Sequence, residues 1–163
     1  MEWIDDLDGA WDREFPDVDT SALPPLVRLT LLSERIEAFQ HGVLEPFELT
    51  LGDYSVLATL RRAGNPYALN PSRLYSRLRV SSGGMTKMLG RLEERGLIKR
   101  KPDPSDGRGS VVSLTRRGLT LQDRVFQAFL AASQNVLAPL SNKQRRDADR
   151  VLRDLLGAFE GRT

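Results

Sequence analysis

One segment of the sequence departs from the helical pattern of the rest, and it limits the folds that are open to the chain. LIKRK (residues 97–101) and SVVSL (residues 110–114) are short β-prone runs. Two prolines and two glycines between them fix a tight turn. The sequence therefore predicts one β-hairpin, with Arg108 near its tip and Asp106 two residues earlier, where its carboxylate can hold the guanidinium.

Apolar residues three and four positions apart predict helices before this hairpin. The expected helices cover residues 4–15, about 25–44, a stretch after Gly52 that stops before AGNPY, and residues 71–78. Asn70 precedes Pro71 and is expected to cap the fourth helix, because proline suits a first helical turn.

Ser81 is expected to cap a further helix that Gly96 ends. The apolar side of this helix consists of Met85, Met88, Leu89 and Leu92. Two helices joined by a tight turn, with a basic outer face, are typical of a helix-turn-helix. With the hairpin following at once, the sequence predicts a winged helix, in which a helix enters the major groove of DNA and the hairpin reaches the minor groove.

Two more helices are expected at the carboxyl end. Thr115 caps the first, and its apolar residues between 119 and 137 extend too far round the cylinder for a helix that packs on one small core. Ser141 and Gln144 have capping-box spacing at the start of the second. This last helix is expected to bury Val151, Leu152, Leu155, Leu156 and Phe159.

Charge is segregated along the chain although the formal net charge is only +2. Residues 70–118 hold twelve Lys and Arg against four Asp and Glu, a net of +8, and the remainder carries −6. A basic middle between acidic flanks indicates that the middle binds a polyanion, and double-stranded DNA is the expected partner. Scattered, solvated charge is the alternative.

Several classes of protein are excluded or disfavoured. The chain has no cysteine and one histidine, His41, so thiolate and multi-histidine metal sites are ruled out. No cofactor, metal or catalytic residue is expected, because no nucleophile with a paired base and no phosphate-binding glycine loop occurs. There is no run of about eighteen apolar residues, and the first residues are acidic, so we expect a cytoplasmic protein without a membrane partner.

The predicted winged helix assigns roles to individual residues. Bases and phosphates in the major groove are expected to meet Ser82, Gly83, Thr86, Lys87 and Arg91. Arg108, supported by Asp106, is expected in the minor groove. Arg73, Arg77 and Lys101 are expected to contact the DNA backbone. The alternatives are a plain helix start, an exposed turn with an incidental ion pair, and a winged helix that binds another protein without responding to a ligand.

The segment VSSGGMTKMLGRLEERGLIKRKPDPSDGRGSVVSLTRRG resembles the MarR family of winged helix-turn-helix transcriptional regulators. The D-x-R wing tip, L-E-x-x-G-L and L-T-x-x-G carry the resemblance. It implies a mainly helical homodimer with a small β-hairpin wing, with dimerisation by residues 1–48 and 119–163 and DNA binding by residues 49–118. It also implies a palindromic operator and a repressor that a small aromatic or anionic ligand releases.

The amino-terminal helix and SSGGMT look like the urate-responsive subgroup of this family. Trp11 and Arg100 stand where that subgroup has ligand-binding residues. Ser55 and Met88 replace its aspartate and its recognition-helix arginine. The resemblance thus implies a pocket at these four positions for a purine-like or aromatic effector, but it does not specify urate, because the charge-assisted bonds that would select urate are lost. Trp11 can equally be a core or interface anchor.

Overall fold

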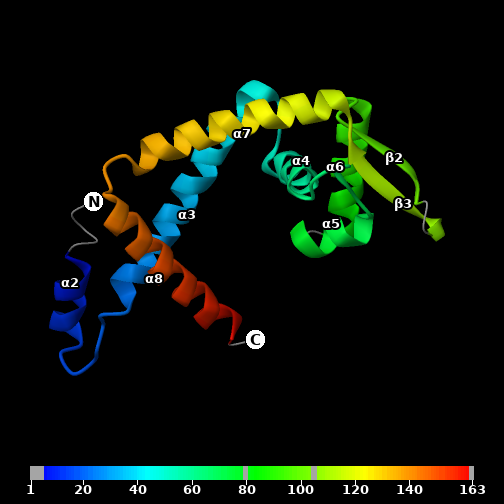
Figure 1. Ribbon diagram of the computed structural model, residues 1–163. Coiled ribbons are helices and arrows are strands. Elements are labelled where there is room, and N and C mark those ends of the chain that lie inside the picture. Colours follow the sequence, from blue (N-terminus) through cyan, green and yellow to red (C-terminus); the bar gives the residue numbers. More distant parts are fainter. Residues whose placement is uncertain (1–5, 79–80, 104–105, 162–163) are drawn as a thin grey trace. The chain divides into compact units, whose positions relative to one another are not determined.

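The computed structural model describes residues 6–78, 81–103 and 106–161, with side chains at all of these positions except 8, 82, 103 and 106–109. Within them the chain is mainly helical with one small sheet (Figure 1). It forms two compact units, Met1–Tyr54 and Ser55–Thr163.

The first unit contains α2 (Leu7–Glu14), α3 (Leu23–Leu44), the short 3-10 helix η1 (Glu45–Phe47) and the start of α4 (Leu51–Arg62). The two helices that the sequence predicts here are confirmed, and a proline occupies the first turn of α3. The hydroxyl of Thr20 donates a 2.8 Å hydrogen bond to the carboxylate of Asp12. This bond ties the segment between α2 and α3 back to α2.

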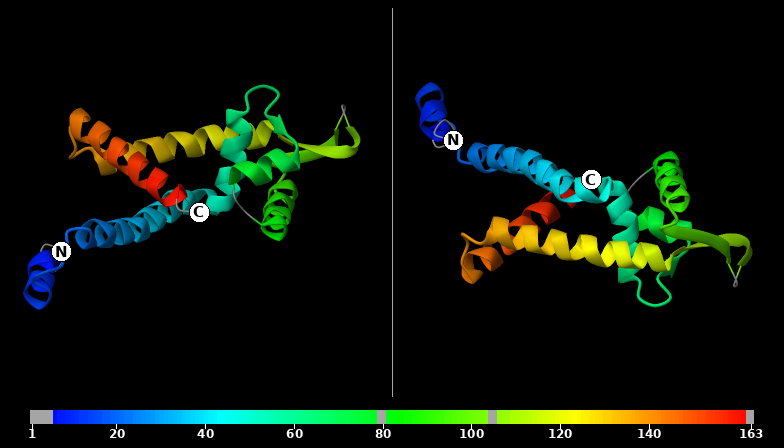
Figure 2. Two further views of the ribbon diagram at one scale, coloured as in Figure 1. Left: turned by 90° about the horizontal axis from the view of Figure 1, so that it is seen from below. Right: turned by 90° about the horizontal axis from the view of Figure 1, so that it is seen from above.

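The second unit holds the rest of α4 and, in chain order, β1 (Ala68–Leu69), α5 (Pro71–Leu78), α6 (Ser82–Glu94), β2 (Ile98–Asp103), β3 (Asp106–Leu114), α7 (Arg116–Leu137) and α8 (Asn142–Glu160). The strands form an antiparallel sheet in the order β1-β3-β2. The predicted hairpin is therefore confirmed as β2 and β3, here called the wing, and it extends away from α5 and α6 (Figures 1 and 2). The sequence did not predict β1.

One apolar core holds residues 55–118, here called the winged-helix lobe. Side chains from four helices and both wing strands contribute to it and are at most 8% exposed. They are Val56, Leu57, Leu60, Leu74, Met85, Met88, Leu89, Leu92, Leu97, Ile98, Val112, Leu114 and, from the first part of α7, Val125. Burial of one leucine side chain favours folding by roughly 1.5–3 kcal/mol. Because these side chains are buried within a single chain, the lobe has a core of its own.

The junction between α6 and α7 is tightly built. Gly96 has a φ of +66° and follows the end of α6, as predicted. Its N–H donates to the carbonyl of Glu93, and the N–H of Leu97 donates to that of Leu92, which is the Schellman pattern. The Thr115 hydroxyl donates to the carbonyl of Gly96 at 2.7 Å and accepts from the N–H of Gly118 at 3.0 Å, so it caps α7 while holding α7 to α6.

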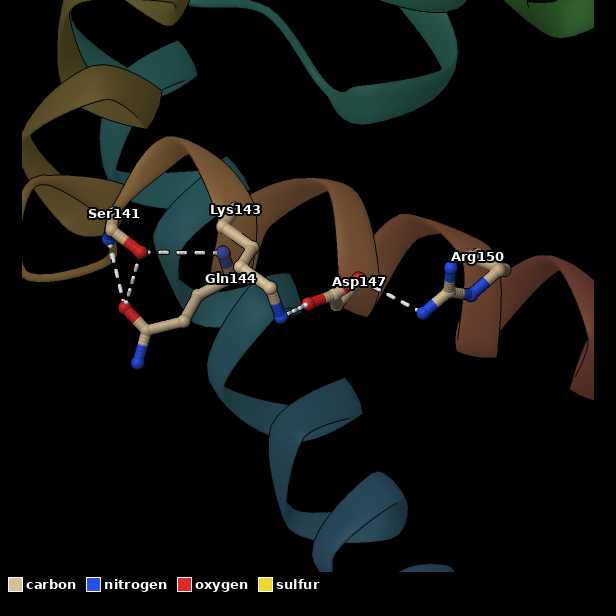
Figure 3. A network of polar contacts seen from close by, with 5 residues as sticks. All are labelled: Ser141, Lys143, Gln144, Asp147 and Arg150. Atoms are coloured by element: carbon tan, nitrogen blue, oxygen red, sulfur yellow. Dashed lines mark hydrogen bonds and ion pairs between the residues drawn. The ribbon is translucent and has the colours of Figure 1, made fainter.

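The carboxyl-terminal helices differ from the lobe in what they bury. The predicted capping box of α8 is confirmed, with Ser141 and Gln144 hydrogen-bonded in both directions (Figure 3). The predicted burial of the apolar side of α8 is wrong for the single chain, because Val151, Leu152, Leu156 and Phe159 are 41–64% exposed. On α7 the large exposed apolar residues are Phe126, Leu130, Val136 and Leu137. Both helices are amphipathic as predicted, but the described part of this chain does not cover their apolar sides.

Candidate nucleic-acid interface

One side of α6 is exposed and basic. Gly83, Lys87 and Arg91 follow one another at four-residue intervals, so they lie on the same side of the helix, and Thr86 is exposed next to them. We call these four residues the basic face. The buried residues Met85, Met88, Leu89 and Leu92 occupy the other side. The core of the lobe therefore fixes which side of α6 faces outward.

The start of α6 is open to a phosphate. The hydroxyl of Ser81 accepts a 3.2 Å hydrogen bond from the N–H of Gly84 and caps the helix as predicted. The first turn contains no acidic residue, and the amino end of a helix carries partial positive charge. A Cβ added at Gly83 would meet no atom within 4 Å, so packing within the chain does not require this glycine. Its small size instead leaves the backbone open to an approaching ligand. The side chain of Ser82 lies outside the described residues.

The preceding helix presents two further cations. Arg73 and Arg77 are exposed and four residues apart on α5. The side-chain oxygen of Asn70 accepts from the N–H of Arg73 at 3.0 Å, which confirms the predicted cap. Both arginines thus lie on one side of a helix with a defined start, while Leu74 between them is buried.

The wing carries exposed basic residues on β2. Lys99, Arg100 and Lys101 are exposed, and Lys101 pairs with Val111 of β3. The register shifts between Pro102 and Asp103, close to the tip. Asp106 and Arg108 belong to β3, but their side chains lie outside the described residues, so the bond expected between them stays a prediction.

Comparisons with known proteins agree with this geometry. The sequence model of the MarR family matches residues 49–110, which run from just before α4 into the wing. The regulator PecS of Dickeya dadantii is 31% identical over 157 residues, which cover 96% of this chain and 92% of PecS. The chain belongs to the MarR family. This membership makes it a transcriptional regulator of the MarR type.

Two further relatives extend the match. The transcriptional repressor Rv2887 of Mycobacterium tuberculosis is 32% identical over 114 residues, which cover 70% of this chain and 80% of that one. A crystal structure of a mutant MarR from Escherichia coli, complexed with operator DNA, superposes with a TM-score of 0.72. It is 25% identical, and the match covers 86% of this chain and 99% of that one. The predicted fold class, mainly helical with a small β-hairpin wing, is confirmed.

The four positions expected to bind an effector have different surroundings in this MarR-family chain. Trp11 in the first unit is 41% exposed and lies against Phe15, with ring centroids 5.7 Å apart. Met88 is 8% exposed and belongs to the core of the lobe, whereas Ser55 is half-buried. Arg100 is ion-paired with Glu93 at 2.9 Å, and its backbone N–H donates to the same carboxylate. An anion that binds Arg100 must therefore compete with Glu93.

One polar contact of the lobe was not foreseen from the sequence. Arg61 of α4 donates a 2.8 Å hydrogen bond to Asp123 of α7, and its guanidinium lies 5.0 Å from the centre of the Tyr67 ring. Hydrogen bonding to Asp123 raises the pKa of Arg61 above its ordinary value. The partners are 62 residues apart in the chain. No spacing rule within a helix or hairpin could have paired them.

Two other kinds of feature are missing from the residues that the structure describes. In the described part of the chain, no cluster of three or more histidine or acidic side chains is placed to hold a metal ion. Across the same residues, every helix is too short or too polar to span a bilayer.

Proposed function

We propose that the protein is a homodimeric repressor that acts in the cytoplasm on a palindromic operator. The basic face of α6, together with Ser82, enters the major groove, and Arg108 of the wing, held by Asp106, enters the minor groove. Arg73, Arg77 and Lys101 contact the DNA backbone. Residues 49–118 carry the DNA binding, while residues 1–48 and 119–163 carry the dimerisation.

The orientation of α6 is the main support for DNA binding. The helix α6 cannot turn about its axis without exposing Met85, Leu89 and Leu92 and unfolding the lobe. The burial of these core residues therefore keeps Lys87 and Arg91 on the surface. The exposed arginines of α5 and the exposed cations of β2 belong to the same basic segment, residues 70–118. A surface of this charge favours a polyphosphate partner.

The apolar surfaces of α7 and α8 support the homodimer. Eight large apolar side chains on these helices are 41–64% exposed in the single chain. Large exposed apolar patches usually mark protein interfaces. A second copy supplies the same surface in a symmetric arrangement, as a two-fold interface requires. Repression, rather than activation, is supported by the relative that is named a transcriptional repressor.

Binding to duplex DNA from the region upstream of the protein's own coding sequence tests the proposal. Fluorescence anisotropy should show affinity that falls steeply with added salt, because bound phosphates release counterions. Lys87→Ala should weaken binding by roughly 1–3 kcal/mol if Lys87 reads a base, or lower the salt slope by about one if it contacts a phosphate. The control is Arg153→Ala, since Arg153 is an exposed arginine of α8 that is paired with Asp149. Equal loss in both variants, or binding that ignores salt, would favour a protein partner instead.

The wing has its own test. Arg108→Ala should weaken binding to the same duplex while leaving the melting temperature unchanged, because a side chain at the tip of a hairpin contributes little to the core. Unchanged affinity at physiological salt would remove the wing from the proposed interface.

An effector is the finer part of the proposal. A small aromatic or purine-like anion binds the protein and lowers its affinity for the operator. The candidate ligand positions are Trp11 in the first unit and, in the second, Ser55, Met88 and Arg100. The anion can lower operator affinity only if it binds the released conformation more tightly than the DNA-binding conformation. Since Glu93 and Arg100 are both partly exposed, their ion pair costs little to exchange for a ligand. Thermal-shift measurements with urate, other purines and aromatic acids test this, and the absence of a shift with all of them would contradict it.

A further inference from the structure

One acidic residue of α6 is bonded to the wing at two points. The carboxylate of Glu93, in the last turn of α6, forms an ion pair with the guanidinium of Arg100 on β2 at 2.9 Å. The other oxygen of the same carboxylate accepts a hydrogen bond from the backbone N–H of Arg100 at 3.3 Å. Glu93 thus contacts both the side chain and the main chain of Arg100. We call these two bonds the wing clamp.

The backbone half of the wing clamp follows from the order of the strands. In the order β1-β3-β2, strand β2 is an edge, so every second N–H along it points away from β3. Arg100 pairs with Val112 of β3, and its N–H is one of these outward donors because it binds Glu93. The next outward position toward the tip is Pro102, which has no N–H. Glu93 therefore binds the last outward N–H of β2 before the register shifts between Pro102 and Asp103.

The place of the wing clamp lets it influence the tip of the wing. The start of β2 is already fixed, because the N–H of Leu97 donates to the carbonyl of Leu92 and the N–H of Thr115 donates to that of Leu97. Past Arg100, β2 continues for three residues, or about 10 Å, and the wing extends away from α6 (Figures 1 and 2). A small tilt of the hairpin therefore moves Arg108, near the tip, by ångströms. A hydrogen bond tolerates a change of only a few tenths of an ångström.

Charge argues against a direct contact between Glu93 and DNA. Glu93 and its neighbour Glu94 are two of the four acids in residues 70–118, where twelve Lys and Arg give a net charge of +8. A free carboxylate in this segment would repel phosphate. The ion pair of the clamp contributes little to stability, because both partners are partly exposed to water. Its contribution is therefore expected in the direction of the wing.

We infer that Glu93 is a positioning residue for DNA binding. It holds β2 so that Arg108 reaches the minor groove while the basic face of α6 lies in the major groove. The inference rests on the proposed function and adds to it a residue that touches no nucleotide. The alternative is that Glu93 only covers the free edge of β2. In that case DNA affinity would depend on Glu93 through its charge alone.

The sign of the change in DNA affinity separates these two roles. Fluorescence anisotropy with the upstream duplex compares Glu93→Ala with its matched control Glu94→Ala, which removes the same charge from the next exposed position of α6. Glu94→Ala should bind as tightly as the wild type or more tightly, because an acid is lost. Glu93→Ala also frees the Arg100 cation, yet it should bind at least about threefold more weakly. Glu93→Gln should lose less, because its amide oxygen still accepts from the Arg100 N–H.

A double-mutant cycle shows whether the wing transmits the loss. Added to Arg108→Ala, the Glu93→Ala change should cause no further loss, whereas added to Lys87→Ala its loss should be undiminished. Without DNA, the Arg100 amide should exchange its hydrogen faster in Glu93→Ala than in the wild type, and the melting temperature of each variant shows that it is folded.

Two results would overturn the inference while the proposed function stands. The first is a wild type that binds the duplex together with a folded Glu93→Ala variant that binds it equally or more tightly. The second is a loss from Glu93→Ala that persists in full beside Arg108→Ala. A wild type that does not bind the duplex would instead contradict the proposed function, and the positioning role would fall with it.

Discussion

The winged-helix lobe and the carboxyl-terminal helices use the same kinds of residue with opposite results. In the lobe, Leu57, Leu60 and Leu92 are completely buried. On α8, Leu156 and Phe159 are more than 60% exposed. Both regions have well-formed helices with side-chain caps, at Ser81, Thr115 and Ser141. Local sequence thus forms helices in both, but only the lobe encloses its own core.

This difference separates two physical tasks within one chain. The lobe must hold the basic face of α6 in a fixed orientation, and a closed core does this without help from a partner. In the proposed homodimer the terminal helices recognise a second copy, and for that an apolar surface has to remain available. Substitutions that remove the same kind of contact should therefore act differently in the two regions.

Leucine truncation gives the largest expected contrast. Leu92→Ala removes a fully buried side chain and should lower the free energy of unfolding by about 2–5 kcal/mol. Leu156→Ala removes a side chain that is 64% exposed in the chain, so it should act through the dimer and make the melting temperature depend more strongly on protein concentration. Urea denaturation at several protein concentrations measures both. Equal, concentration-independent losses would mean that the two regions form one core.

A methyl group at the α6–α7 junction gives the next largest effect. Gly118→Ala places a Cβ 1.9 Å from the Leu97 carbonyl oxygen, so α7 must shift, at a cost of about 1–3 kcal/mol. Gly90→Ala is the control within α6, because a Cβ there meets no atom within 4 Å. It should stabilise the protein by up to about 1 kcal/mol, since alanine favours helix. Thermal denaturation compares the pair, and similar losses in both variants would contradict the close contact at Gly118.

Loss of a helix cap should have the smallest effect. Ser141→Ala removes the side-chain half of the capping box on α8 and should cost about 1 kcal/mol. Ser133→Ala is the control on α7, because the Ser133 hydroxyl only donates back to the Phe129 carbonyl within the helix, which contributes little. Hydrogen exchange of the α8 amides should report faster opening in the first variant alone.

Much of the lobe could be predicted from sequence because its determinants are local. Ser81, Thr115 and Ser141 each cap a helix through a residue three positions away, and the Asn70 cap follows the same rule. The wing was recognised from a turn between two β-prone runs, and its strands pair as the turn requires. Spacing along one element was sufficient in all of these cases.

What was missed depends on residues that are distant in the chain. The strand β1 contains only two residues, which pair with Ser113 and Val112. It is too short to form a run of β-prone residues that could be recognised in the sequence. The Arg61–Asp123 ion pair likewise joins segments that are separated in sequence. The sequence predicts the apolar side of α8 from its periodic pattern. Such a pattern shows that this side must be covered, but it does not show whether the same chain or a second copy covers it.

Sedimentation equilibrium tests most directly whether the terminal helices serve a second copy. The wild type at micromolar concentration should have twice the 18.3 kDa mass of one chain. Leu130→Glu places a charge on the exposed apolar side of α7 and should give a folded monomer with weaker DNA binding, whereas Gln127→Glu, at an exposed polar position of the same helix, should remain a dimer. A wild type that sediments as a monomer, or a Leu130→Glu variant that stays fully dimeric, would contradict this assignment.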